Sequence, residues 1–236
     1  MTDVTTVTEH EDLRSSWLLR RHEAAVLGSS YVLFTAMWSA AGWLLTRRLS
    51  DSWVLHLDRS IADWFVDHRT HALNSLSFIA SMMADTVVKI VVTAMVATIM
   101  LIRWRRWLEP LMVVVPLVLE ALSFITVTTV VGRPRPDVPR LDSSPVGSSF
   151  PSGHVAAAVV YSAIVVVIFW RTDRRWLRWV AATVATLLPI LVALARMYRG
   201  MHYFTDVIAG AMLGGASVAV TAFVLRSADQ RRRGST

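Results

Sequence analysis

The chain has 236 residues, of which 54% are hydrophobic and only 17% carry a charged side chain, and its mean hydropathy is +0.49. Soluble domains carry about 25% charged residues; because the apolar residues here also form long blocks, the composition excludes an ordinary soluble domain and indicates a membrane protein. The net charge of +7 arises from arginines clustered between these blocks, which indicates cytoplasmic loops rather than nucleic-acid binding, and the absence of cysteine excludes disulfides.

The first part of the chain combines a polar tail with one apolar run. Residues 1–24 are polar and mixed in charge, which predicts a disordered cytoplasmic tail. The apolar run over residues 26–46 is long enough to cross a hydrocarbon core of about 30 Å and too long for the core of a signal peptide. We therefore expect this run to remain in the chain as a spanning helix.

The next segment predicts an amphipathic helix on the membrane surface. Apolar side chains recur there at spacings of three and four residues, and acidic side chains lie opposite them. The apolar members are Trp53, Leu57, Ile61, Trp64 and Phe65, and the acidic members are Asp51, Asp58, Asp63 and Asp67. The tryptophans are expected at the level of the lipid headgroups.

Further apolar runs complete the predicted architecture. They cover residues 87–102, 108–131, 155–170, 177–194 and 204–225, and each is long enough to cross a membrane. The fold class is therefore all-α, a bundle of six transmembrane helices with the amphipathic surface helix between the first and second. We assign residues 25–226 to this membrane domain and residues 227–236 to a basic cytoplasmic tail.

Arginine clusters predict the orientation of the bundle. Six spans with both termini in the cytoplasm place three arginine-rich segments on the cytoplasmic side: the loops after the second and fourth spans, and the C-terminal tail. Arg47 and Arg48 oppose this assignment, because they follow the first span and would therefore lie on the outer side. In the last span, Gly210 and Gly214 favour close packing within one bundle over a dimer interface, and the oligomeric state stays open.

Three polar clusters have no role in packing apolar helices, and the predicted topology places all of them at the outer end of the bundle. They are Gly132-Arg133-Pro134-Arg135-Pro136 after the third span, Phe150-Pro151-Ser152-Gly153-His154 before the fourth, and Arg196, His202 and Asp206 around the junction of the fifth and sixth. A bundle can bring these ends together, so we expect one site.

Four residues of these clusters suit the binding of phosphate. The planar guanidinium groups of Arg135 and Arg196 can each donate two hydrogen bonds to phosphate oxygens. Ser152 and Gly153 open a helix, where unpaired backbone N–H groups and the positive end of the helix dipole attract anions. Glycine also permits close approach of the anion to the backbone.

Three further residues of the clusters suit nucleophilic and acid–base chemistry. His202 and Asp206 are four residues apart, so the carboxylate can fix the imidazole tautomer and leave the other nitrogen free to attack. His154 is then available as the general acid that protonates the leaving oxygen. Zinc binding is an alternative use of these side chains, but no further ligand lies in the clusters and the arginines would repel the cation. We expect no metal and no other cofactor.

The clusters resemble the three motifs of the type 2 phosphatidic acid phosphatase (PAP2) family. The family shows Lys, six residues and Arg-Pro; then Pro-Ser-Gly-His; then Ser-Arg, five residues, His, three residues and Asp. Here the second motif is intact at residues 151–154, and the third reads Ala195-Arg196, with His202 and Asp206 at the family's spacing. The resemblance covers residues 25–226 and implies a six-span, metal-independent phosphatase.

Position by position, the resemblance implies a phosphohistidine mechanism. His202 attacks phosphorus, Asp206 orients and charges the imidazole, and His154 protonates the leaving group. The residues that hold the phosphoryl oxygens are Arg135, Arg196, Ser152 and Gly153.

The chain departs from the family at two motif positions. Ala195 replaces the serine, and Thr128 replaces the lysine, which removes a charged phosphate contact worth on the order of 1.5–3 kcal/mol. We expect either Arg133 or Lys89, the only lysine in the chain, to supply that charge at the phosphate site. The alternative for Lys89 is an ion pair with Asp85, four residues earlier.

Glu120 stands deep in the third span, about two helical turns before the motif position of the missing lysine. An ionisable group at that depth is costly, so it is a candidate functional residue. The alternative is a protonated carboxyl group that is hydrogen-bonded to a neighbouring helix. The sequence leaves both interpretations open.

The predicted function is hydrolysis of a lipid phosphate or diphosphate at the outer surface of a cell membrane. Polyprenyl diphosphate is the leading substrate by family analogy, with phosphatidate or phosphatidylglycerophosphate next. One alternative is a phosphotransferase that passes the phosphoryl group to a lipid or sugar hydroxyl. Another is a lipid-phosphate binder or transporter that lost catalysis with the change to Thr128. Membrane lipids are the expected partners, and no nucleic acid is expected.

Overall fold

The computed structural model describes residues 21–49, 51–144 and 146–233, and these residues form helices and loops without β-strands. The helices are α2 (Arg21–Arg47), α3 (Trp53–Asp67), α4 (His71–Met82), α5 (Thr86–Trp104), α6 (Leu108–Val131), α7 (Gly153–Val160), α8 (Ser162–Arg171), α9 (Arg175–Tyr198) and α10 (Phe204–Arg233). The all-α fold class is confirmed. Residues 1–20 of the predicted tail lie outside the described residues, whereas residues 21–24 already belong to α2.

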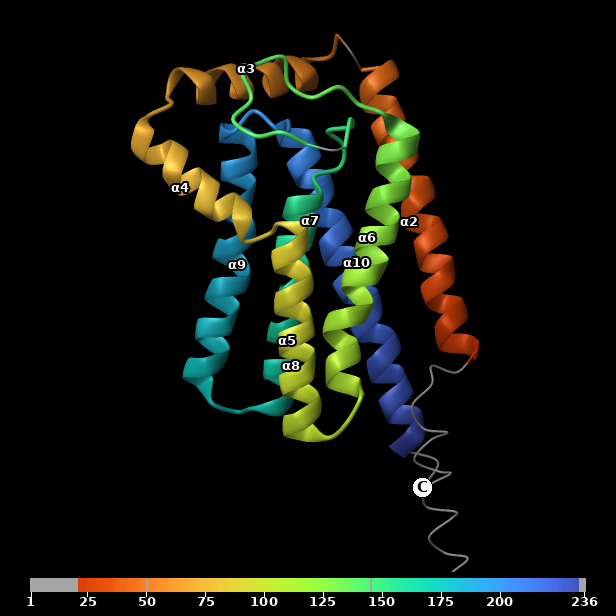
Figure 1. The fold of residues 1–236 in the computed structure, drawn as a ribbon. Coiled ribbons are helices and arrows are strands. Elements are labelled where there is room, and N and C mark those ends of the chain that lie inside the picture. The colour runs from red at the N-terminus through yellow and green to blue at the C-terminus, as the bar shows by residue number, and fades with distance from the viewer. Residues whose placement is uncertain (1–20, 50, 145, 234–236) are drawn as a thin grey trace, which may run out of the picture.

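Six helical segments in the described residues are long and apolar enough to cross a membrane, so the chain is a multi-pass membrane protein. They are α2, α5, α6, α7 continued by α8, α9 and α10, which stand side by side in Figure 1. α7 and α8 form one span, because Tyr161 between them keeps right-handed helical dihedral angles. Every predicted apolar run falls within one of these spans, which confirms the six-span prediction.

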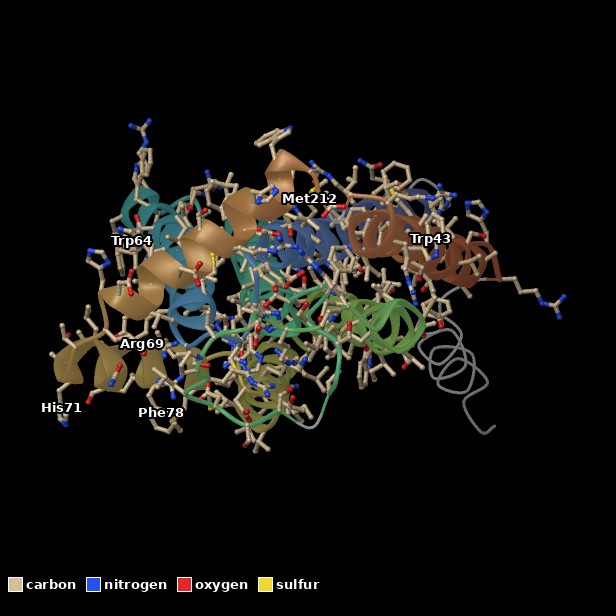
Figure 2. The ribbon with its side chains drawn as sticks, turned by 90° about the horizontal axis from the view of Figure 1, so that it is seen from above. Trp43, Trp64, Arg69, His71, Phe78 and Met212 are labelled. Atoms are coloured by element: carbon tan, nitrogen blue, oxygen red, sulfur yellow. The ribbon has the colours of Figure 1, made fainter. Side chains whose placement is uncertain are left out.

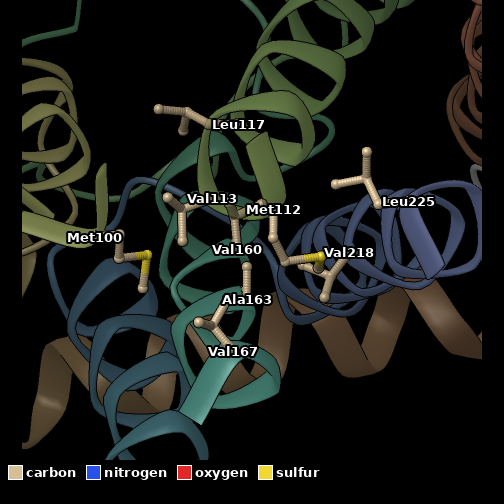
Figure 3. Packing of buried hydrophobic residues seen from close by; sticks show 9 residues of the cluster. All are labelled: Met100, Met112, Val113, Leu117, Val160, Ala163, Val167, Val218 and Leu225. Carbon is tan, nitrogen blue, oxygen red and sulfur yellow. The ribbon is translucent and has the colours of Figure 1, made fainter. Parts of the chain in front are cut away.

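Small and medium-sized apolar side chains fill the centre of the bundle. Figure 3 shows one such cluster, made of Met100, Met112, Val113, Leu117, Val160, Ala163, Val167, Val218 and Leu225. The outer faces are apolar as well; Ile102 is 72% exposed and Phe223 is 70% exposed. Apolar side chains that are exposed over whole helix faces are unfavourable in water but fit a bundle surrounded by lipid.

α3 lies across one end of the bundle, as Figure 1 shows, which confirms a helix of this kind between the first two spans. Trp53 and Trp64 are exposed on it, as expected for side chains at a membrane surface. The predicted polar face is wrong for Asp58, which is only 1% exposed. α3 turns Leu55, Asp58 and Ala62 toward the bundle, because the Asp58 carboxylate has buried basic and hydroxyl partners there.

α4 is a second helix in the connection between the first two spans, and the sequence analysis does not predict it. Figure 2 looks down on this end and shows α3 followed by α4 along its edge, with Arg69 at their junction. Arg69 Nη2 donates to the carbonyl oxygen of Tyr198 at 2.9 Å, and Thr70 caps α4 by accepting a hydrogen bond from the Leu73 N–H. These contacts fix the surface helices to the end of α9.

Two glycines bring α10 close to α7. A Cβ atom at Gly210 would lie 2.3 Å from the carbonyl oxygen of Ser152, and one at Gly214 would lie 2.4 Å from that of Ala156. Only a residue without a side chain fits at such a distance. As predicted, these glycines serve packing within the bundle, and they set His202 and Asp206 beside the motif at the start of α7.

The start of α2 and the end of α10 lie at the same end of the bundle. The Glu23 carboxylate pairs with Arg231 at 2.9 Å. Figure 1 places the arginine-rich loops between α5 and α6 and between α8 and α9 at this end as well, opposite to α3. α10 continues to Arg233, so residues 227–233 of the predicted basic tail extend the last helix.

Candidate active site

A cavity of about 320 Å³ lies where the three motifs meet, between the starts of α5 and α7 and the end of α9. The predicted site residues that line it are Lys89, Arg135, Gly153, His154, Arg196 and His202. They come from α5, α7, α9 and two loops, so residues distant in sequence form one site, as expected. The rest of the lining includes the polar side chains Ser81, Asp85 and Asp142 and the apolar side chains Phe78, Met82 and Phe124.

His202 lies buried in the turn between α9 and α10. Its Nδ1 atom is 2.7 Å from the carbonyl oxygen of Ser149. Because a carbonyl oxygen only accepts, Nδ1 donates its proton there and the lone pair lies on Nε2. Burial, and then the positive charges of Arg196 and Arg135, hold the pKa of His202 well below its usual value. The imidazole is therefore neutral, with Nε2 free to act as a nucleophile.

Asp206 does not make the hydrogen bond that the sequence predicts. Its Oδ2 atom is 3.9 Å from His202 Nδ1, which is too long for a hydrogen bond. The prediction assumed that both residues lie on one helix, but α10 begins at Phe204 and His202 precedes it. The Asp206 carboxylate instead accepts from the Tyr203 N–H at 2.8 Å and from Arg133 at 2.5 Å, and it stays close to the imidazole as a charge.

Three buried hydrogen-bond groups in the motifs have no partner within the described residues: Arg135 Nε, Arg196 Nε and Ser152 Oγ. The Nη1 atoms of both arginines are held by hydrogen bonds. Arg135 Nη1 donates to the Met201 carbonyl oxygen at 2.6 Å, and Arg196 Nη1 donates to Ser81 Oγ at 2.6 Å. Buried donors without partners are rare in proteins. Groups of this type, clustered in the motifs around the cavity, are what a bound phosphate would satisfy.

The sequence pattern of the PAP2 superfamily matches residues 110–230, which is slightly more than half of the chain. The chain belongs to the PAP2 superfamily. The matched range contains all three motifs and nearly all of the four spans from α6 to α10, with α7 and α8 counted as one. The resemblance inferred from the motifs is therefore confirmed.

Two solved structures share this PAP2 fold. One is a transmembrane PAP2-type phosphatidylglycerolphosphate phosphatase from Bacillus subtilis, with a TM-score of 0.68 and 23% identity over 86% of this chain and 96% of that one. The other is LpxE from Aquifex aeolicus, with a TM-score of 0.52 and 23% identity over 73% of this chain and 94% of that one. No curated protein sequence matches the chain. At these identities the likeness concerns the fold.

Three residues expected at the phosphate site, Thr128, Arg133 and Ser152, do not line the cavity of this PAP2 chain. Thr128 Oγ1 donates to the carbonyl oxygens of Phe124 and Ile125, both at 2.9 Å, because its short side chain reaches only its own helix. The guanidinium of Arg133 instead donates hydrogen bonds to the carboxylates of Asp58 and Asp206.

Lys89 does line the cavity, at the start of α5 and close to His154. Its ammonium group pairs with Glu120 on α6, with Nζ 3.7 Å from Oε2, so the expected ion pair with Asp85 is wrong. Asp85 instead caps α5 by accepting from the Val87 N–H at 3.0 Å. Glu120 is fully buried, and its carboxyl group faces the ammonium group of Lys89 from the neighbouring helix.

Asp142 is a cavity residue that the sequence analysis missed. It accepts hydrogen bonds from Arg196 at 2.8 Å and from Arg199 at 2.5 Å. Burial acts to raise the pKa of Asp142, but the hydrogen bond from Arg199 and the charge of Arg196 outweigh it and hold that pKa below its usual value. The available signal was an acidic residue between the first two motifs, in a chain whose site arginines need a counter-charge.

The described residues, 21–49, 51–144 and 146–233, contain no group of three or more histidine or carboxylate side chains close enough to hold a metal ion. Metal-independent chemistry stays a prediction that a chelator can test. The arginine-lined cavity suits an anion directly, because it contains Arg135 and Arg196 with unpaired Nε atoms.

Proposed function

We propose that this chain is a metal-independent phosphatase that hydrolyses a lipid phosphate or diphosphate through a phosphohistidine at His202. One observation carries the proposal. A neutral imidazole with a free Nε2 lines the same cavity as His154 and as two arginines whose Nε atoms are buried without partners. Such a site can bind a phosphoryl group, attack it and protonate the leaving oxygen without a metal ion.

The first step forms the phosphoenzyme. The Nε2 lone pair of His202 attacks phosphorus while the bond from phosphorus to the leaving oxygen breaks. That oxygen takes a proton from the His154 imidazolium and departs as a lipid alcohol or a lipid monophosphate. The phosphorylated imidazole keeps its proton on Nδ1, where the Ser149 carbonyl accepts it at 2.7 Å and the nearby Asp206 carboxylate balances the positive charge.

The second step returns the enzyme to its starting state. A water molecule attacks phosphorus and gives its proton to His154, which has become neutral. The bond between phosphorus and Nε2 then breaks, His202 recovers its lone pair, and inorganic phosphate leaves. The sum of both steps is the hydrolysis of one phosphate ester or anhydride bond.

The oxygens of the transferred phosphoryl group are held by Arg135, Arg196 and Gly153 in this proposal. The unpaired Nε atoms of the two arginines supply the first contacts, and the N–H groups at the start of α7 add to them. Lys89 replaces the lysine that the family has at position 128, because it reaches the same cavity from α5. Among the described residues its one carboxylate partner is Glu120, at 3.7 Å.

The place of the cavity supports a lipid substrate on the extracytoplasmic face. The arginine-rich loops and the ends of α2 and α10 lie at the opposite end of the bundle, which favours the cytoplasm for that end. Phe78, Met82 and Phe124 give the cavity an apolar side for a lipid tail. Polyprenyl diphosphate, phosphatidylglycerophosphate and phosphatidate are the substrates to compare; the Bacillus subtilis neighbour is named for the second.

Phosphate release by the detergent-purified protein tests the proposal. The three lipids are offered in the presence of EDTA to the wild type and to His202→Ala. Release that continues in EDTA and disappears in the variant supports the proposal and ranks the substrates. Release that needs a divalent metal, or that survives in His202→Ala, contradicts it. A phosphorylated acceptor in place of free phosphate would identify a phosphotransferase.

A further inference from the structure

A buried cluster of three charges joins the surface helix α3 to the candidate active site. Arg133 Nη1 donates to Asp206 Oδ1 at 2.5 Å, and Nη2 of the same guanidinium donates to Asp58 Oδ2 at 2.9 Å. The three side chains are 4%, 0% and 1% exposed, respectively. Breaking a buried ion pair leaves an uncompensated charge, so these three groups are strongly coupled.

The same cluster fixes the start of α10. Asp58 Oδ1 accepts from the Thr205 N–H at 3.0 Å, and Oδ2 accepts from the Thr205 hydroxyl at 2.5 Å. The Arg133 guanidinium lies over the ring of Tyr203, 4.5 Å from its centre. Tyr203 and Thr205 directly follow the turn that carries His202. Through Asp58, α3 therefore restrains that turn at Tyr203, just before α10, and at Thr205 in the first turn of α10.

The number of charges in the cluster matters for the chemistry. With Arg133 alone as its partner, the Asp206 carboxylate would be neutralised and could contribute little to a positive charge on the imidazole. Asp58 shares the guanidinium, so the two carboxylates and one arginine together keep one negative charge, 3.9 Å from His202 Nδ1 on the Asp206 side. This charge is in place before the phosphohistidine forms and requires no rearrangement.

We propose that Asp58 is a positioning residue for the reaction, which acts through Arg133 to hold the Asp206 carboxylate and the His202 turn in their reactive arrangement. The inference rests on the proposed phosphohistidine function. Asp58 touches neither the cavity nor His202, so it should affect the chemical step and leave the binding of the phosphate group unchanged. If Asp58 only anchored α3, its substitution would lower the stability of the protein. It would not lower kcat while KM stays constant.

Steady-state kinetics of Asp58→Asn test the proposal, with inorganic phosphate release from phosphatidylglycerophosphate and polyprenyl diphosphate as the readout. Asp63→Asn is the matched control, because it makes the same charge change at an exposed position of the same helix. We expect Asp58→Asn to lower kcat by about 10- to 100-fold with KM within about twofold. Asp63→Asn should match the wild type. Equal kcat values for the two variants would overturn the proposal.

A double variant tests whether Asp58 acts through Arg133. If it does, Asp58→Asn should lower kcat much less when Arg133→Met is already present than it does in the wild type. If the two losses multiply, Asp58 does not act through Arg133 and the proposal is wrong. Should Asp58→Asn fail to fold, Thr205→Val decides, because it removes a hydroxyl that bonds both Asp58 and Arg133. Its kcat should then fall at unchanged KM, and a wild-type kcat would refute the proposal.

Phosphate release by the wild-type protein distinguishes a failure of this inference from a failure of the proposed function. Absence of EDTA-resistant phosphate release from every lipid by folded wild-type protein would remove the function on which the inference rests. Wild-type release together with an unaffected Asp58→Asn would remove the inference alone.

Discussion

A single methyl group between α10 and α7 should separate the two halves of the active site. In Gly210→Ala the new Cβ would lie 2.3 Å from the Ser152 carbonyl oxygen, about 1 Å closer than ordinary contact allows. The new Cβ is fixed to the backbone of α10, and it meets a backbone oxygen of the segment that leads into α7. No side-chain rotation can relieve this clash, so the two helices must move apart. A displacement of about 1 Å in an active site can lower the rate about 100-fold, and overpacking costs about 1–3 kcal/mol of stability.

Two other glycines of α10 serve as controls. Gly215→Ala adds the same methyl group where no atom lies within 4 Å, so it should keep full activity and gain slightly in stability from its higher helix propensity. Gly214→Ala meets the Ala156 carbonyl oxygen at 2.4 Å, one turn farther from His202. It should destabilise the protein about as much as Gly210→Ala but cost less activity.

The assay pairs phosphate release in detergent with thermal unfolding of the same samples. We expect Gly210→Ala to lose about 100-fold in kcat at a temperature where it remains folded. Activity of Gly210→Ala equal to that of Gly215→Ala would refute the account of how α10 and α7 assemble the site.

The remaining predictions concern the phosphate site. Lys89→Met should lower kcat/KM about 10- to 100-fold, because a charged hydrogen bond contributes about 1.5–3 kcal/mol. The double variant Lys89→Met/Glu120→Gln leaves no buried unpaired carboxylate and should show the same loss. Wild-type kinetics in both variants would exclude Lys89 from phosphate binding. Thr128→Val should keep kcat/KM within about twofold, because the Thr128 hydroxyl bonds only its own helix, and a larger loss would place it in the site. Because the pKa of His202 is lowered, its imidazole should stay neutral between pH 7.5 and 5.5 in an NMR titration, whereas with the usual pKa of about 6.5 only about a tenth of it would be neutral at pH 5.5.

The spans and the motif positions could be predicted from the sequence because each depends on local information. A run of about 20 apolar residues must cross the membrane as a helix, since backbone groups in lipid have no other partners. The three motifs flank these runs, so the topology alone brought Arg135, His154 and His202 to one end.

The contacts that hold the site together could not be predicted, because they depend on where loops place backbone atoms and single charges. No pattern marks the Ser149 carbonyl as the partner of His202, since every residue has a carbonyl group. Asp58 and Asp63 both read as polar positions of an amphipathic helix, yet one is buried against Arg133 and the other is exposed. α4 lacks an apolar run long enough to distinguish it from a loop.

The central claim is that His202 carries the phosphoryl group, and trapping that intermediate tests it most directly. The purified protein would be mixed in EDTA with phosphatidylglycerophosphate or polyprenyl diphosphate that carries ³²P in the terminal phosphate, then quenched in alkali within milliseconds to seconds. The account predicts an alkali-stable, acid-labile label on the peptide that contains His202 in the wild type, and no label in His202→Ala. Label that persists in His202→Ala, or full phosphate release by a wild type that never becomes labelled, would contradict it.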